Sequence, residues 1–455
     1  MCSRVLRRCI AKWETDFLRK SFVLVFIAAV SAGVIGAGSA YGHGFAGKRF
    51  FPSTLSTDDP FVMDELSLPT IASRKMPASD NEPATRETDY SLDFTKRITP
   101  NLGIEFGATY KRLSPEGGNT VSGFDNYSAG IKYRFYESDE HETLLSAGFD
   151  WDIGGTGTKR IAAESFSTIT PALFFGKGFG DLPESLKYLR PFALTGLAGI
   201  AVPTQASATQ VADDGSISIE RHPHVLNWGL AVEYSIPYLQ SFVEDVGLRG
   251  PFNRLIPVVE FAFATPLDRG GGATTGTVNP GITWIGRYMQ YGLEAVIPVN
   301  DHTGSSVGVI GQIHFFCGRY FPEDYRQTIV WELTMRSYTF VLATFAVLIG
   351  FVSEAGAHAF LDQALPAVGS TVHGSPSDVR LWFTEELEPA FSTLRVLDQS
   401  GKQVDNKDKE VDRKDASVLR VSLPQLPPGT YRVVWRVLTV DTHVSEGDFT
   451  FSVAP

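Results

Sequence analysis

The chain has 455 residues, more than one hydrophobic core usually serves, so we expect at least two folded units. Its formal net charge of -11 argues against a nucleic-acid-binding protein. The 43 glycines, 15 tyrosines and 32 phenylalanines favour β-structure with many turns. Two of the three cysteines lie in the N-terminal leader and only Cys317 remains, which excludes a disulfide framework within one mature copy.

The N-terminus, residues 1–40, has the layout of a secretory signal peptide. Several arginines and lysines precede the apolar run "SFVLVFIAAVSAGVIGAGSA", and the small residues Gly38 and Ala40 fit cleavage after Ala40. The alternative is an N-terminal transmembrane anchor, but the glycines and alanines crowded at the far end of the run favour a signal.

Residues 41–86 match no motif, and we predict an irregular segment that is either a periplasmic lead-in or a plug. Residues 87–318 then show short segments of strict two-residue alternation, as in strands whose side chains point to opposite faces. In one of them Tyr127, Ala129, Ile131, Tyr133 and Phe135 oppose Ser128, Gly130, Lys132 and Arg134. About ten to twelve such strands are expected, many of about nine to eleven residues, a length that spans a bilayer at a tilt.

The two faces of these strands suit different solvents. The polar face is rich in Gly, Ser, Asp, Glu and Lys, whereas the apolar face ends in Tyr, Trp and Phe. This predicts an antiparallel outer-membrane β-barrel with lipid outside and water inside. The alternative is a soluble β-sandwich or a secreted barrel. No catalytic pattern is seen here, and His141, His222 and His224 fit exposed polar loops better than a metal site.

A second export signal follows a predicted linker over 319–334. Met335 and Arg336 precede the apolar run "SYTFVLATFAVLIGFV", and Ala355 and Ala357 stand where signal peptidase reads small residues. Residues 335–357 are therefore predicted to be an internal signal peptide, or else an uncleaved membrane helix. The simplest explanation is that two neighbouring secreted proteins are joined in one reading frame.

Residues 358–455 show short strands rich in Val, Leu and Phe, separated by Pro, Gly and Asp turns. This spacing predicts a small Ig-like Greek-key β-sandwich. The whole chain is thus expected to be all-β, apart from two helices formed by the signal-like segments.

Three stretches of this last unit resemble the CopC family of periplasmic copper-binding proteins. They are "HAFLDQALPAVGSTV", "LWFTEELEPAF" and "LPPGTYRVVWRVLTVDTHVSEGDFTFSV", and together they cover essentially the whole predicted domain. The D-x-H triplet alone is weak, because such triplets commonly form turns. A histidine directly after the signal, a Glu in an F-[ST]-E turn and the final D-x-H are a strong combination in this order.

The chemistry of these residues fits copper. Cleavage after Ala357 would free the α-amine of His358, which together with its imidazole can chelate one ion. Asp441 and His443 are two residues apart, so on an extended segment they project from the same face. Cu(II) favours such nitrogen and oxygen ligands.

The resemblance implies His358, Asp441 and His443 as Cu(II) ligands, with Glu385 at the family's Glu position. Glu385 could ligate copper weakly, support a ligand, or be one of three solvated acids together with Glu386 and Glu388. We expect Trp435 to be a core aromatic and His373 to be solvated. The last methionine of the chain is Met335, so the predicted domain lacks the thioethers that would hold Cu(I).

The predicted function is periplasmic Cu(II) binding in copper resistance or homeostasis, without enzymatic activity, fused to an outer-membrane barrel. The resemblance also implies a CopD-like inner-membrane copper transporter as a partner, and the barrel implies outer-membrane lipid. One alternative is a pore or transport protein with an accessory copper domain. A histidine-brace copper monooxygenase is a further alternative, although it needs a flat aromatic substrate face on a larger domain.

Overall fold

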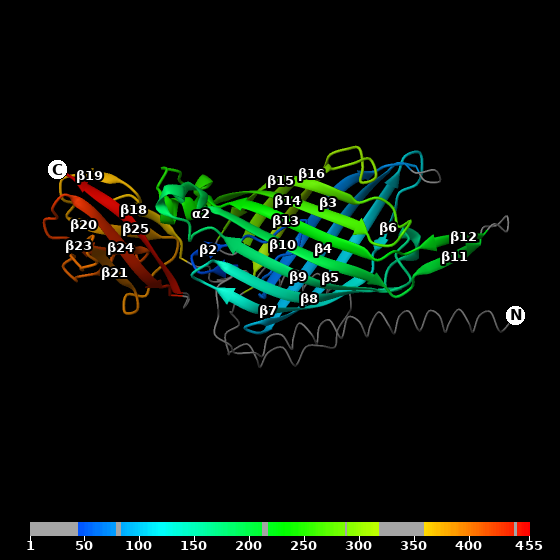
Figure 1. Cartoon of the computed structure of the whole chain (residues 1–455), viewed down its shortest axis with the longest axis horizontal. Helices are drawn as coiled ribbons and strands as arrows, with labels where there is room; N and C mark the ends of the chain where they lie inside the picture. Colours follow the sequence, from blue (N-terminus) through cyan, green and yellow to red (C-terminus); the bar gives the residue numbers. More distant parts are fainter. Residues whose placement is uncertain (1–43, 79–82, 212–216, 287–288, 318–358, 441–443) are drawn as a thin grey trace, which may run out of the picture.

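The computed structural model describes residues 44–78, 83–211, 217–286, 289–317, 359–440 and 444–455. The signal-like segments 1–40 and 335–357, the linker 319–334 and three predicted copper ligands, His358, Asp441 and His443, lie outside these residues. The described chain is all-β, as predicted, with a barrel and a smaller sandwich placed end to end (Figure 1). Among the residues described, no helix is both long and apolar enough to cross a membrane.

The barrel is one antiparallel sheet of 12 strands, closed by pairing between β4 and β5. This agrees with the ten to twelve strands expected. The strands in chain order are β3 (Glu65–Met76), β4 (Thr85–Thr99), β5 (Leu102–Pro115), β7 (Tyr127–Ser138), β8 (Thr143–Ile153), β9 (Thr168–Gly178), β10 (Phe192–Pro203), β13 (Val225–Tyr234), β14 (Leu255–Pro266), β15 (Thr275–Ile285), β16 (Met289–Pro298) and β17 (Gly308–Phe316). The short strand β6 (Val121–Phe124) adds to the end of β5.

The first strand corrects a predicted boundary. β3 begins at Glu65, within the segment 41–86 that was expected to be irregular, and it closes the barrel between β17 and β4. Its sequence "ELSLPTIASRKM" carries a proline and a register shift between Ser67 and Thr70, which obscure the two-residue period.

The barrel strands present apolar side chains outward and polar ones inward. Ile131, Tyr133 and Phe135 of β7 are 51%, 49% and 53% exposed, whereas the alternate residues Lys132 and Arg134 are buried. Exposed aromatic and aliphatic residues on other strands include Ile104, Phe149, Trp151, Leu173, Trp228, Tyr291 and Leu293. Buried polar residues include Ser146, Glu233, Glu260, Asn279, Gln290 and Glu294. The predicted alternation is therefore confirmed.

The barrel interior is not simply filled with water, because residues 44–64 lie against its inner wall and form a plug. Glu260 of β14 accepts backbone N–H bonds from Leu55, Ser56 and Thr57 at 2.6–2.8 Å. The plug begins with the small hairpin of β1 (Phe45–Ala46) and β2 (Arg49–Phe50). Of the two forms expected for this part of the chain, the plug is the one found.

Side chains of other wall strands hold the same segment. Gln290 both accepts from and donates to the backbone of Ser53, and Lys132 donates to Asp58 and to the carbonyl of Asp59 at 2.9 Å. Glycines on the wall make room: a Cβ at Gly292 would lie 2.5 Å from the Leu55 side chain. The plug is therefore built into the wall through polar and steric complementarity.

The connections at the two ends of the barrel differ. At the end away from the sandwich, β11 (Ser207–Val211) and β12 (Ile217–Arg221) form a hairpin that projects outward (Figure 1). At the sandwich end, the segment between β13 and β14 contains α2 (Ile236–Tyr238), η3 (Leu239–Val243) and η4 (Phe252–Arg254). A second rim segment at this end contains η2 (Glu184–Leu189).

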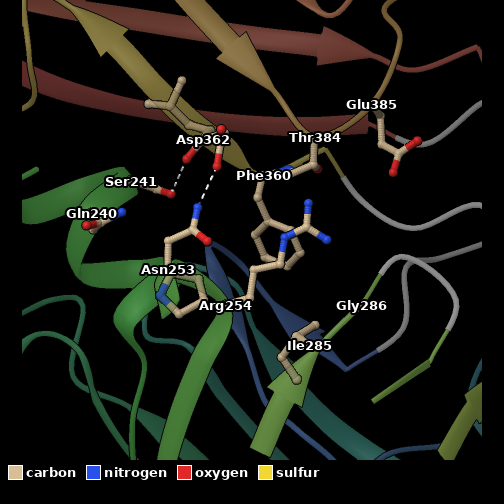
Figure 2. Close-up of a pocket in the computed structure, with 12 residues that line it drawn as sticks. Gln240, Ser241, Asn253, Arg254, Ile285, Gly286, Phe360, Asp362, Thr384 and Glu385 are labelled. Carbon is tan, nitrogen blue, oxygen red and sulfur yellow. Dashed lines mark hydrogen bonds between the residues drawn. The ribbon is translucent and has the colours of Figure 1, made fainter. Parts of the chain in front are cut away.

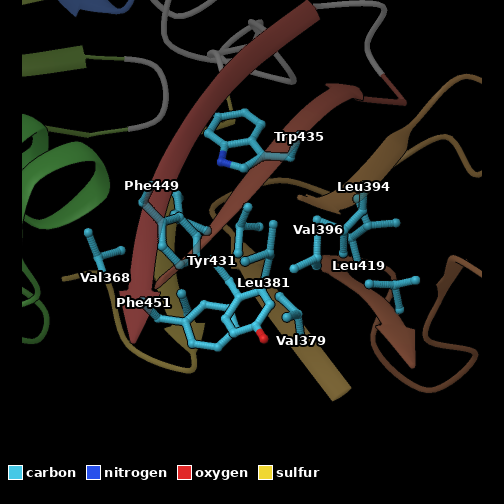
Figure 3. Packing of buried hydrophobic residues seen from close by; sticks show 14 of the residues in the cluster. Val368, Val379, Leu381, Leu394, Val396, Leu419, Tyr431, Trp435, Phe449 and Phe451 are labelled. Atoms are coloured by element: carbon cyan, nitrogen blue, oxygen red, sulfur yellow. The ribbon is translucent and has the colours of Figure 1, made fainter. Parts of the chain in front are cut away.

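The sandwich consists of two four-stranded sheets, ordered β18-β20-β23-β22 and β19-β25-β24-β21. The strands are β18 (Leu361–Leu365), β19 (Thr371–His373), β20 (Asp378–Phe383), β21 (Thr393–Leu397), β22 (Glu410–Val411), β23 (Val418–Ser422), β24 (Gly429–Leu438) and β25 (Val444–Ala454). Alternate residues of β20, β24 and β25 point inward and form the core shown in Figure 3. Trp435 is 2% exposed within this core, as predicted.

Candidate functional site

Of the four predicted copper ligands, Glu385 is the one within the described residues. It follows β20 in the sequence and is 3% exposed, while Glu386 beside it is exposed. Glu385 is therefore not one of a group of solvated acids, and that alternative is wrong. The other three lie outside the described residues, and the nearest described residues in the sequence are Ala359, Val440 and Val444.

The segment after residue 358 runs beside the Glu385 turn. The backbone N–H of Phe360 donates to the Thr384 hydroxyl, and the N–H of Thr384 donates to the carbonyl of Phe360, both at 3.0 Å. These bonds extend the β18–β20 pairing, in which Leu361 is opposite Phe383. Because antiparallel partners advance in opposite directions, the chain at Ala359 lies next to Glu385.

The β24–β25 connection reaches the same turn. The N–H of Val440 donates to the carbonyl of Glu386 at 3.0 Å, and Thr439 forms a β-bridge with Leu387. The two strands close on each other at the pair Leu438 and Val444. The chain leading to residue 441 thus starts directly beside the turn that carries Glu385.

This end of the sandwich packs on a pair of buried aromatic side chains. Trp435 of β24 packs edge-to-face on Phe383 of β20, with 5.0 Å between ring centroids. Leu387, which follows the Glu385 turn, is 2% exposed and belongs to the same core. The turn is therefore anchored on both sides by buried side chains.

Glu385 also lines a pocket between the sandwich and the barrel (Figure 2). The sandwich contributes Phe360, Asp362 and Thr384, and the barrel end contributes Asn253, Arg254 and Ile285, among others. Sequence analysis did not identify the barrel residues: Asn253 and Arg254 lie in a rim connection without a periodic pattern, and Ile285 is the last residue of β15. Nothing in their spacing predicts that they meet residues so much later in the chain.

The histidines that were predicted to be solvated or to lie in polar loops are found in such positions. His373 is exposed at the end of β19. His224 contacts Asp268 at 2.9 Å, and His222 stacks on Phe166 with 4.0 Å between ring centroids. Within the part of the chain that the structure describes, no three His, Cys, Asp or Glu residues form a metal-binding cluster.

The sequence of the C-terminal unit matches the CopC domain family over residues 361–454. Copper resistance protein C of Escherichia coli is 31% identical over 119 residues, which cover 25% of this chain and 94% of that protein. Protein YobA of Escherichia coli K12 is 32% identical over 121 residues, which cover 26% of this chain and 97% of that protein.

Solved structures resemble each part of the chain separately. CopC from Methylosinus trichosporium OB3b is 37% identical and covers 22% of this chain and 95% of its own, with a TM-score of 0.21. An outer membrane channel from Pseudomonas putida F1 is 10% identical and covers 61% of this chain and 99% of its own, with a TM-score of 0.39.

Proposed function

The C-terminal domain of this chain belongs to the CopC family, and we propose from this that it binds Cu(II) at the end of the sandwich that carries Glu385. The α-amine and imidazole of His358 would supply two nitrogens, and Asp441 and His443 would complete the ligand set. One observation carries the proposal: backbone hydrogen bonds of Phe360 and Val440 bring the flanks of these residues to the same turn.

The chemical groups of the proposed ligands suit Cu(II). Imidazole, amine and carboxylate groups are ligands that Cu(II) accepts in a tetragonal arrangement. Glu385 adds a buried carboxylate at the place where the flanking segments meet, so it can bind the ion or hydrogen-bond to a ligand. No methionine follows Met335 in the sequence, which favours Cu(II) over Cu(I).

The experiment that tests this proposal uses residues 358–455 alone. This domain has its own hydrophobic core, and a solved CopC chain consists almost entirely of the matching region. We expect tight Cu(II) binding when His358 is the N-terminus, and a loss of at least about tenfold in affinity when one extra residue precedes it, since a chelating nitrogen is then removed. The variant His373→Ala is the matched control and keeps its affinity. Equal affinity with and without the extra residue would contradict the proposed ligand set.

The domain is proposed to act as a carrier in copper resistance or homeostasis, with a CopD-like inner-membrane transporter as a partner, rather than as an enzyme. The described part of the sandwich is small, and the strands of its two sheets pack around one hydrophobic core. We expect no oxygen consumption above that of free copper when the loaded domain receives a reductant and a polysaccharide. Copper-dependent turnover that disappears in His443→Ala would favour the monooxygenase alternative.

The barrel is proposed to lie in the outer membrane, with its sandwich end towards the periplasm. The support is physical: large apolar residues such as Leu173 and Leu293 are 61% and 56% exposed on the outer face, while charged residues are buried inside. A pore or transport role for the barrel is the second candidate function. Outer-membrane fractionation and heat-modifiable migration on gels test the location, and recovery in the soluble fraction would contradict it.

Both units are proposed to be exported and processed. The alignment with Protein YobA spans 26% of this chain, which is longer than residues 358–455, so it reaches into the predicted internal signal. N-terminal sequencing of the products from expressing cells should find mature termini near residue 41 and at His358. A single uncut product would leave the α-amine of His358 in a peptide bond and would remove the basis of the chelate.

A further inference from the structure

The junction between the barrel and the sandwich is an exchange of aromatic side chains. Phe360 of the sandwich packs against the barrel-end cluster of Phe50, Ile256, Ile285 and Phe316. Its ring lies 6.1 Å from that of Phe50 and 5.7 Å from that of Phe45, measured between centroids. The sandwich thus inserts a side chain into a hydrophobic cluster that belongs to the barrel end.

The barrel makes the reciprocal insertion. Phe242 of η3 packs against the sandwich core and stacks on Trp435, with 6.3 Å between centroids and 17° between ring planes. A Cβ at Gly447 would lie 2.5 Å from the Phe242 ring, so the sandwich surface is shaped to receive this side chain. Aromatic anchors that fill a pocket on the partner carry much of the energy of protein interfaces.

Polar contacts surround the two aromatic anchors. Ser241 donates to the carbonyl of Leu361 at 2.7 Å, and Asn253 donates to the carboxylate of Asp362 at 2.6 Å, both visible in Figure 2. Further along the rim, the backbone N–H of Asp245 donates to the carbonyl of Val368 at 3.2 Å. Lys48 of the plug segment lies over the Phe242 ring, with its Nζ 5.7 Å from the ring centroid, and forms an ion pair with Asp448.

These contacts join segments that are far apart in the sequence, and they combine aromatic packing, hydrogen bonds and an ion pair. An apolar centre with polar contacts around it is the anatomy of a specific interface. We propose that the barrel end is a docking surface for the CopC-family domain, and that the two stay associated as a non-covalent complex after the chain between them is cut. The domain docks with its Glu385 end towards the barrel, because the pocket beside Glu385 is lined by both partners.

The test uses the full chain, purified in detergent, with a protease site inserted in the linker 319–334. After cleavage at micromolar concentration and in the presence of a chelator, gel filtration should show the sandwich fragment eluting with the barrel. Because the chelator removes copper, this result does not depend on the proposed metal site. If the sandwich fragment of the unmutated protein eluted entirely apart from the barrel, the proposal would be overturned.

Two variants locate the surface. Phe242→Ala should weaken the association of the cut fragments by at least about tenfold, because a buried aromatic anchor is lost. Phe391→Ala is its control, since Phe391 is an aromatic residue of the sandwich that is 64% exposed. Heat-modifiable migration of the barrel, unchanged in both, shows that the barrel still folds. Co-elution of Phe242→Ala as complete as that of Phe391→Ala would overturn the proposed surface.

The second variant is Lys48→Glu, which sets a carboxylate against Asp448 and should weaken association most strongly at low salt. Lys75→Glu is closely matched: Lys75 also forms an ion pair, with Glu116, and its side chain is 37% exposed against 38% for Lys48. Lys75 lies at the opposite end of the barrel, at the end of β3. If both charge reversals left association unchanged, the docking surface would not include the plug segment.

Discussion

At the scale of single residues, Trp435 links the core of the sandwich to its surroundings. Its ring is buried, contacts Phe383 from the opposite sheet and stacks on Phe242 from the barrel. Gly447 lies opposite it on β25 and leaves the space that the two rings occupy. One side chain therefore contributes both to the stability of the domain and to its docking.

Replacing Trp435 by alanine should lower the free energy of unfolding of residues 358–455 by about 3–5 kcal/mol, because the substitution leaves a large cavity in the core. Urea unfolding followed by circular dichroism measures the change. The matched control is Trp382→Ala on β20, whose half-buried side chain points to the face opposite the inward-facing Leu381 and Phe383. If both variants lost the same free energy of unfolding, the larger contribution expected from the buried Trp435 would be contradicted.

The burial of Glu385 leaves two of its three expected roles, a weak copper ligand or a residue that supports a ligand. Because it is buried beside the segments that lead to the proposed ligands, we expect Glu385→Gln to weaken Cu(II) binding by roughly 10-fold or more. Glu386→Gln, at the exposed neighbouring position, should bind copper as the unmodified domain does. Competition titrations against a chelator of known affinity measure both variants. Unchanged affinity in Glu385→Gln would remove this residue from the site.

At the scale of elements, the plug segment explains why the barrel wall carries so many buried polar residues. Backbone groups of an irregular segment need hydrogen-bond partners when water is displaced. Glu260 on β14 and Gln290 on β16 supply them, and glycines such as Gly229 and Gly292 make room for plug side chains. The inner wall is thus matched to one particular segment of the same chain.

Removing the Glu260 carboxylate should loosen the plug. In Glu260→Ala, the N–H groups of Leu55, Ser56 and Thr57 lose their acceptor, at a cost of about 1–3 kcal/mol for each one left unsatisfied. We expect faster hydrogen exchange in residues 53–59 and a larger ion current through the barrel in planar bilayers. The control is Glu233→Ala, a buried wall glutamate that does not accept these bonds. The same exchange rates in both variants would contradict this role of Glu260.

At the scale of the whole molecule, the two units meet at the barrel end that carries both the start of the plug and the η3 segment. Lys48 lies in the turn of the β1–β2 hairpin, so the plug itself contacts the sandwich through Asp448. The plug segment therefore takes part both in filling the barrel and in contacting the sandwich. Copper bound beside Glu385 would lie at this shared end, between the domain and the barrel.

The Asp448 contact makes docking sensitive to acid. Burial raises the pKa of Asp448, but its bonds to Arg432 and Lys48 outweigh this and hold the pKa below the ordinary value of 3.8. Arg432 belongs to the sandwich itself, whereas Lys48 comes from the barrel, so docking favours the carboxylate through the Lys48 bond. This contribution is complete above the ordinary pKa of 3.8 and is lost as the pH falls through the lowered pKa. Co-elution of the cut fragments should be constant at pH 5–7 and decline below about pH 4. Asp448→Asn should associate more weakly and show a smaller decline in this range.

The sequence alone determined the class of each unit. Alternation such as that of Ile131, Lys132, Tyr133 and Arg134 fixes which side chains face out, because successive strand residues point to opposite faces. The motifs around Glu385 and Trp435 were enough to identify the CopC-family domain. These features are local, since they depend on residues a few positions apart.

Only the tertiary structure decided what lies inside the barrel and what covers its end. The contacts of Glu260 with Ser56, and of Phe242 with Trp435, join residues about two hundred positions apart. Neither the plug segment nor the segment that contains Phe242 has a periodic pattern. An irregular chain satisfies its backbone groups with the side chains that the fold brings near, so no local rule predicts its partners. The strand β3 was hidden for a different reason, since its proline and register shift interrupt the alternation. Pairing across such distances is set by the closure of the barrel and the packing of the two units, which no short stretch of sequence records.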